Sequence, residues 1–326
     1  MKKFFACLSL LPALVFGQYA PVAGFPGTTA IHKDSSAIIA WANEVVVQRG
    51  YLDIQDTTFS VDGTNKASFG IPENAVGPAQ GNAMDVVSLG DGGEAVLYFN
   101  GPILNGPGPD FAVFENSFAS DYLELAYVEV SSDGQNFVRF PSHSLTQTQL
   151  QISGFGSLEA IKLNNLAGKY KGGYGTPFDL EELVDSTNLD LNNIQWVKII
   201  DVVGTIGDSA RYDSHGNKIN DPYPTPYPSG GFDLDGVAQL HGFVGLDEVV
   251  EISFTVYPNP SKGKIHLRSE HEISEISLYD LQGSLISSQI IQGREATLNL
   301  ELNQGIYLLI ANIDGQNVQQ RISILN

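Results

Sequence analysis

The sequence has one cysteine and few basic residues for its length. Cys7 is the single cysteine among 326 residues. One cysteine cannot form an internal disulfide or a multi-cysteine metal site, so both are excluded. There are 17 Lys and Arg against 37 Asp and Glu, and the formal net charge is −20. This charge disfavours binding to nucleic acid or anionic membranes, and it leaves carboxylates free to bind cations.

The first 17 residues have the pattern of a secretory signal peptide. Lys2 and Lys3 precede an apolar run over residues 4–16, and Gly17 offers a cleavage position before Gln18. The run is shorter than the roughly 20 residues that span a bilayer. No later stretch is apolar enough to span one. We therefore expect residues 1–17, including Cys7, to be removed, and the mature chain to be exported with no transmembrane segment.

Glycine and proline are abundant, with 34 and 16 copies. Short apolar or alternating runs separated by turn residues predict an all-β unit over residues 18–242, built as an antiparallel β-sandwich of jelly-roll type. One exception is expected near the start, where apolar residues between Ile38 and Val46 recur at helical spacing after Asp34 and before Gly50. The predicted strands cover residues 85–89, 94–100, 110–115, 122–131, 136–140, 159–163, 194–203 and 232–241.

The pattern changes after residue 242. Residues 243–253 are expected to form a linker, and residues 254–326 alternate in six or seven short strands, the size of a small immunoglobulin-like β-sandwich. Asp314-Gly315 is expected to form a hairpin turn. The expected strands cover residues 264–267, 273–279, 284–291, 296–300, 306–312 and 318–324.

Three landmarks in this tail carry a resemblance to a known family. Tyr257-Pro258-Asn259-Pro260 is followed by Gly263, then by Gly305-Ile306-Tyr307 and a closing basic strand around Arg321. In these features residues 254–326 resemble the type A C-terminal sorting domain of the type IX secretion system. The resemblance implies that the tail engages that secretion machinery, and that the protein is secreted or held at the outer-membrane surface.

Carboxylates concentrate in two apolar runs. Asp110 and Glu115 flank the run 111–114, whereas Asp233 and Asp235 would lie on one face of a strand, about 7 Å apart. Paired carboxylates in an apolar strand repel each other unless a cation or hydrogen-bond donors offset the cost. These four residues are therefore the predicted ligands of a structural Ca²⁺ ion. A second acidic loop covers residues 208–221, with a spacing similar to that of a calcium loop but without its bidentate Glu. Asp201 could approach this loop, although an Asx-rich surface turn and a capped or paired carboxylate are the alternatives.

Five sequence blocks carry a second resemblance. They are Asn105–Asn116, Val128–Gly134, Gly173–Leu180, Asp221–Pro226 and Ser229–Asp235. Together they resemble a family of Bacteroidota cell-surface proteins for which no activity is assigned. Its layout is similar to that of calcium-stabilised jelly rolls, among which carbohydrate-binding modules are common.

Tyrosines in Gly- and Pro-rich loops are the candidate ligand contacts. Tyr170, Tyr174, Tyr223 and Tyr227 could stack on a sugar ring or another flat ligand, with Lys169 among the polar partners. Packing beneath their own loops is the alternative. The sequence has no HExxH, GxSxG or P-loop motif. We expect a calcium-stabilised ligand-binding protein, with a glycan as the candidate ligand. The alternatives are an accessory that captures a nutrient or cofactor for a transporter, and a glycoside hydrolase.

Overall fold

The computed structural model describes residues 19–242 and 254–325, which belong to two compact units. The first unit comprises the described residues up to 242, and the second comprises residues 254–325. The predicted signal peptide (1–17) and the predicted linker (243–253) lie outside the described residues.

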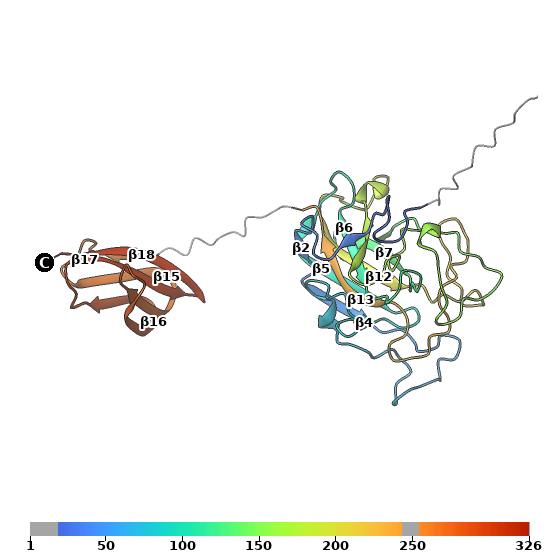
Figure 1. Cartoon of the computed structure of the whole chain (residues 1–326), viewed down its shortest axis with the longest axis horizontal. Helices are drawn as coiled ribbons and strands as arrows, with labels where there is room; N and C mark the ends of the chain where they lie inside the picture. The colour runs from blue at the N-terminus through green and yellow to red at the C-terminus, as the bar shows by residue number, and fades with distance from the viewer. Residues whose placement is uncertain (1–18, 243–253, 326) are drawn as a thin grey trace, which may run out of the picture. The chain divides into compact units, whose positions relative to one another are not determined.

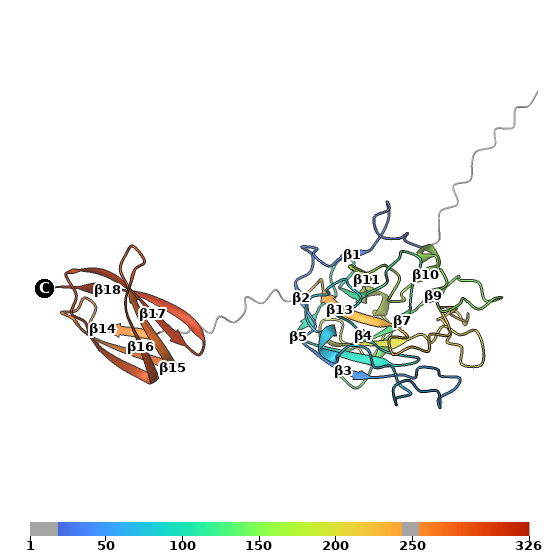
Figure 2. The same ribbon diagram turned by 60° about the horizontal axis from the view of Figure 1, so that its bottom comes forward.

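Two antiparallel sheets form the centre of the first unit, with long loops around them (Figures 1 and 2). The first sheet has the order β1 (Ile31–His32), β11 (Tyr174–Phe178), β6 (Phe111–Glu115), β13 (Asp233–Gln239) and β2 (Ala40–Trp41), and β4 (Val87–Ser88) also pairs with β13. The second has the order β3 (Glu44–Gln48), β5 (Glu94–Ile103), β12 (Ile194–Asp201), β7 (Ala126–Ser131) and β8 (Val138–Arg139). A small separate sheet pairs β9 (His143–Ser144) with β10 (Leu163–Asn164).

Both large sheets contribute to one hydrophobic core. Buried side chains of β5, β7 and β12 belong to the same cluster as those of β6, β11 and β13. At its centre the rings of Phe111, Phe140 and Phe178 contact one another, with centroids 5.1–5.7 Å apart. Burying one such side chain stabilises the fold by about 1.5–3 kcal/mol. The all-β class is confirmed, whereas the jelly-roll connectivity stays a prediction.

The helix predicted after Asp34 is wrong. Ala40–Trp41 forms β2 and pairs with β13, and Glu44–Gln48 forms β3 and pairs with β5. In β3 the side chains alternate between exposed and half-buried, the two-residue period of a strand. The three consecutive valines, 45–47, are β-branched and lose side-chain freedom in a helix. Pairing with two existing strands therefore outweighs the helical spacing.

Two further segments differ from the sequence prediction. The strand expected over residues 159–163 is mostly a 3₁₀ turn, η2 (Ala160–Lys162), in which the N–H of Lys162 donates to the carbonyl of Glu159. Conversely, the sequence places Tyr174 in a loop, whereas the structure has a strand, β11, at this point. It pairs with β1 at its start and with β6 at its end. The other 3₁₀ turns in the described residues are η1 (Pro72–Ala75) and η3 (Leu180–Leu183).

The second unit is a curled antiparallel sheet with its own core. Its strands are β14 (Phe254–Tyr257), β15 (Lys264–Tyr279), β16 (Leu285–Asn299), β17 (Gly305–Ile313) and β18 (Gln316–Ile324). The expected short strands within 264–279 and 285–299 are continuous. The register shift between Arg268 and Ile273 lies at a predicted break, and two more shifts lie within the predicted strand 273–279. The Asp314-Gly315 turn joins β17 to β18, and both residues have positive φ angles, 47° and 81°.

Candidate functional site

The four candidate tyrosines lie in different environments. Tyr170 is 2% exposed, and its hydroxyl is 2.9 Å from that of Thr29. Tyr223 is 6% exposed and donates a hydrogen bond of 3.0 Å to Asp53. Tyr174 belongs to β11. Tyr227 is 48% exposed. Tyr170 and Tyr223 are therefore buried, and of the four candidates only Tyr227 is exposed.

Tyr227 belongs to a row of aromatic side chains that the sequence did not reveal. The row is Phe118, Tyr122, Phe155 and Tyr227, and we call it the aromatic row. Successive ring centroids are 4.5, 6.1 and 6.2 Å apart, and the first two pairs are nearly parallel, with interplanar angles of 21° and 23°. Phe118 and Phe155 are 74% and 70% exposed. Phe155 is the one aromatic residue between β9 and η2, and Phe118 shares the segment between β6 and β7 with Tyr122 alone, so no local pattern singled them out.

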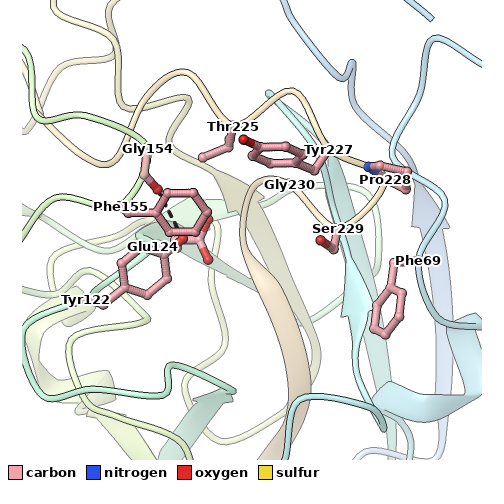
Figure 3. Close-up of a pocket in the computed structure, with 10 residues that line it drawn as sticks. All are labelled: Phe69, Tyr122, Glu124, Gly154, Phe155, Thr225, Tyr227, Pro228, Ser229 and Gly230. Carbon is pink, nitrogen blue, oxygen red and sulfur yellow. Dashed lines mark hydrogen bonds between the residues drawn. The ribbon is translucent and has the colours of Figure 1, made fainter. Parts of the chain in front are cut away.

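Three members of the aromatic row border a pocket of about 420 Å³, which we call the aromatic pocket (Figure 3). Glu124 lies among these rings and is the one carboxylate in the lining. It is 7% exposed, and its carboxylate has no hydrogen bond within residues 19–242 and 254–325. The pocket lining is Phe69, Tyr122, Glu124, Gly154, Phe155, Thr225, Tyr227, Pro228, Ser229 and Gly230.

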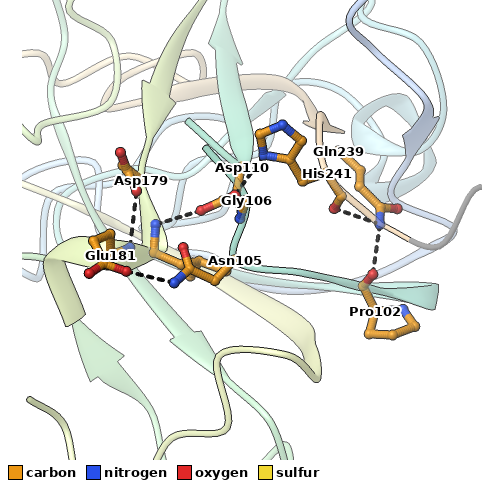
Figure 4. A network of polar contacts seen from close by, with 9 residues as sticks. Pro102, Asn105, Gly106, Asp110, Asp179, Glu181, Gln239 and His241 are labelled. Atoms are coloured by element: carbon orange, nitrogen blue, oxygen red, sulfur yellow. Dashed lines mark hydrogen bonds and ion pairs between the residues drawn. The ribbon is translucent and has the colours of Figure 1, made fainter. Parts of the chain in front are cut away.

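Asp110, a predicted calcium ligand, has a full set of protein partners instead (Figure 4). One oxygen accepts from the N–H of Gly106 at 2.7 Å and lies 2.8 Å from Nδ1 of His241. The other accepts from the N–H of Leu180 at 2.7 Å. These contacts tie the loop before β6 to the start of η3 and to the segment that follows β13. Asp110 thus has a structural role in this network.

Asp235 is likewise satisfied by backbone donors. Its two oxygens accept from the N–H groups of Gln80 and Gly81 at 2.8 and 2.7 Å. Asp233 has other partners, the hydroxyl of Ser88 and the amide of Asn116. The ladder between β13 and β6 shifts at this point, because Asp235 is an extra residue in β13. This β-bulge interrupts the regular alternation on which the prediction of a shared face rested.

Glu115 and Asp233, the other two predicted ligands, belong to a cluster of buried carboxylates. Both interact electrostatically with Glu124. Asp201 and Asp221 are further members, and Asp91 interacts with both. We call these six residues the acidic cluster. The structure therefore brings Glu115 and Asp233 together with four carboxylates that come from other segments, and it leaves Asp110 and Asp235 in separate networks.

Burial and mutual repulsion raise the pKa values of the acidic cluster. Burial is the main cause of the raised pKa of Glu124, and the charges of Asp233 and Glu115 add to it. Burial, followed by repulsion from Asp201, raises the pKa of Asp91 to about 8. Asp201 accepts from the N–H groups of Gly92 and Phe232, yet burial still raises its pKa to about 6. The protein's own hydrogen-bond donors and basic groups thus do not offset the negative charge of the cluster.

Four members of the cluster, Asp91, Glu124, Asp201 and Asp221, border a second cavity of about 10 Å³. Glu124 and Thr225 line both this cavity and the aromatic pocket. In the residues that the structure describes, no three acidic, histidine or cysteine side chains are already arranged to hold a metal ion. The carboxylates surround the cavity but do not converge on one point.

The two units define an all-β protein with an acidic first unit and a separate C-terminal sheet. Residues 255–325 match the family described as secretion system C-terminal sorting domain, so the second unit is a sorting domain of this kind. The protein is therefore exported by type IX secretion to the cell surface or beyond. A search of curated proteins found no match to the chain. In the described residues, no helix is long and apolar enough to cross a membrane.

Similarity to solved structures is low throughout. PorZ, a surface component of the type-IX secretion system of Porphyromonas gingivalis, has 13% identity over 28% of this chain and 14% of its own, with a TM-score of 0.21. The BSP domain of a biofilm-associated protein has 11% identity over 72% of this chain and 48% of its own, with a TM-score of 0.24. Ruminococcus gnavus β-glucuronidase has 12% identity over 72% of this chain and 35% of its own, with a TM-score of 0.18. The chain spans less than half of each, and none of these likenesses assigns it a function.

Proposed function

We propose that the first unit is an exported ligand-binding module that holds a glycan in the aromatic pocket. The observation that carries this proposal is the aromatic row. Hydrophobic rings of this size are normally buried, and four in sequence along a surface are typical of a binding site. The pocket volume of about 420 Å³ lies within the range of ordinary small-molecule sites, about 300–1,000 Å³.

The pocket chemistry suits a sugar. Faces of Tyr122, Phe155 and Tyr227 offer flat apolar surfaces for the C–H face of a sugar ring. Glu124 has acceptor oxygens without protein partners, so sugar hydroxyls can donate to it and relieve the cost of its burial. Stacking supplies affinity in this arrangement, and the single carboxylate supplies orientation.

The same lining favours binding over hydrolysis. Glycosidases usually place two carboxyl groups on opposite sides of the bond they cleave, roughly 5–9.5 Å apart. Glu124 is the one carboxylate that lines the aromatic pocket. Asp91, Asp201 and Asp221 line the smaller cavity instead. The pocket therefore supports a binding role for Glu124.

The proposal is tested by screening the purified protein against immobilised glycans and measuring hits by calorimetry. Phe155→Ala and Tyr227→Ala each remove one stacking ring, and we expect each to weaken binding roughly tenfold or more. A panel of small nutrients and cofactors in the same assay tests the alternative role of capturing a molecule for a transporter.

Phe25→Ala is the matched control. Phe25 is 62% exposed but does not line the pocket, so its removal is expected to leave binding unchanged. No binding to any glycan would contradict the proposal. Glycan binding that survives both Phe155→Ala and Tyr227→Ala would place the site elsewhere.

A further inference from the structure

The smaller cavity combines strong negative charge with the absence of any basic side chain in its wall. Apart from the four carboxylates, its lining is Val202, Val203, Pro222, Thr225 and Gly231. A volume of about 10 Å³ accommodates roughly one water-sized sphere. The cavity is therefore large enough for a single ion and too small for an organic ligand.

The four carboxylates differ in how far the protein satisfies them. Asp201 accepts from three backbone N–H groups, those of Gly92, Val203 and Phe232, through its two oxygens. Both of its oxygens are thus engaged, and the side chain holds three loops together. Asp201 thus holds the backbone around the cavity in place.

The other three carboxylates have unused acceptor atoms. Asp221 is 5% exposed, and its Oδ2 accepts from the N–H of Leu125 at 2.7 Å, while its buried Oδ1 has no partner. Asp91 accepts from the N–H of Ile54 at 2.9 Å through Oδ2 alone. Glu124, described above, has no hydrogen-bond partner in the described residues. At least four carboxylate oxygens are thus free to bind a cation.

Buried carboxylates without partners destabilise a fold by several kcal/mol each unless a proton or a cation neutralises them. Ca²⁺ accepts six to eight oxygen ligands at about 2.3–2.6 Å in flexible geometry. Mg²⁺ requires near-ideal octahedral geometry and gives up its water reluctantly. An irregular, oxygen-lined cavity without nitrogen or sulfur ligands therefore favours calcium.

We propose that Asp91, Glu124 and Asp221 bind one calcium ion at this cavity, with Asp201 fixing the loops around it. The carboxylates border the cavity without converging, so binding requires Glu124 and Asp221 to turn their oxygens toward the ion. Of the sequence-predicted ligands, Glu115 and Asp233 contribute charge to the acidic cluster but do not line the cavity. Glu124 also connects the ion to the aromatic pocket.

A thermal melt of the full-length secreted chain tests the ion directly and uses no glycan. The two tryptophans, Trp41 and Trp196, both lie in the first unit, so their fluorescence reports that unit alone. The protein is stripped with EGTA, then melted in EGTA, in calcium and in magnesium. At a hundredfold excess over Kd, we expect calcium to raise the midpoint by roughly 5–10 °C. No difference between EGTA and millimolar calcium would overturn the proposal, and an equal shift with magnesium would contradict the choice of calcium.

Two variants locate the ion. Asp221→Asn and Glu124→Gln keep the side-chain shape and are expected to abolish the calcium-dependent shift while leaving the EGTA midpoint unchanged or higher, because each removes a buried charge. The control is Asp235→Asn, a buried carboxylate outside the cavity, which should retain the shift. A shift that persists in both cavity variants would refute this location. The two proposals have separate readouts. Absence of the calcium-dependent shift contradicts the ion site alone, and absence of glycan binding contradicts the proposed function alone.

Discussion

Lys169 offers a quantitative test of how burial affects charge in the first unit. It is 4% exposed, and its ammonium donates a hydrogen bond of 2.8 Å to the carbonyl of Leu163. Burial lowers its pKa from 10.5 to about 8. A difference of this size corresponds to about 3 kcal/mol by which the charged amine destabilises the native state below pH 8. The charged amine of Lys169 therefore lowers the stability of the native state. Because the side chain is buried, it is not available as a polar partner for a ligand.

We expect Lys169→Met to be more stable than the wild type at pH 7, by about 2 kcal/mol. Methionine keeps the flexible apolar chain and removes the buried charge, and losing the hydrogen bond to Leu163 subtracts about 1 kcal/mol. The wild-type native pKa lies below the unfolded one, so wild-type stability rises as the pH rises from about 8 to 10.5. Above pH 10.5 the wild-type amine is neutral in both states, so the variant keeps only the loss of the hydrogen bond and becomes the less stable protein.

Urea unfolding followed by the fluorescence of Trp41 and Trp196 measures this difference at pH 7 and pH 10.5. Lys171→Met is the control, because Lys171 is exposed two residues away and should change stability little at either pH. An advantage of Lys169→Met that is the same at both pH values would refute the assignment to a buried charge.

Two further predictions concern the framework of the first unit, both measured by the same urea assay. Gly168 and Gly173 share a φ angle of 81°, but a Cβ at Gly168 would lie 1.8 Å from the carbonyl oxygen of Glu124, whereas Gly173 has open space. Gly173→Ala should cost about 1 kcal/mol and Gly168→Ala several more; equal costs would refute the clash. Asp110→Ala should cost about 2–5 kcal/mol because it leaves the buried N–H of Leu180 unpaired, and a loss below 1 kcal/mol would contradict this role.

Much of the fold could be predicted from local patterns. β5 alternates from Glu94 to Phe99, and Asp314-Gly315 has the turn chemistry of a hairpin. The helix expected near Val45 failed because strand pairing with β5, far along the chain, decides that segment. β11 was missed for the same reason, since its glycine and proline weaken a local strand signal that β6 overrides.

The candidate site was less predictable, because its parts come from distant segments. Tyr223 has the features of an exposed loop tyrosine until its hydroxyl is seen to reach Asp53, 170 residues earlier in the chain. Asp91, Glu124 and Asp221 meet only in the folded protein. Asp221 begins one of the five sequence blocks, but no block contains Asp91 or Glu124. Sequence reasoning predicted a cation at buried carboxylates, which stays a prediction. It chose the pairs visible along single strands, and none of those four residues lines the smaller cavity.

The place of β13 in the first sheet has a consequence for the order of events during synthesis. This strand, Asp233–Gln239, is the last of the first unit, and it pairs with β6, β4 and β2. The sheet therefore cannot close until nearly all of the unit has left the ribosome, and its contacts of large sequence separation form late. A chain that ends before residue 233 would lack both a completed core and the sorting domain. Premature termination would thus leave a fragment with neither a completed first sheet nor the C-terminal domain for type IX secretion.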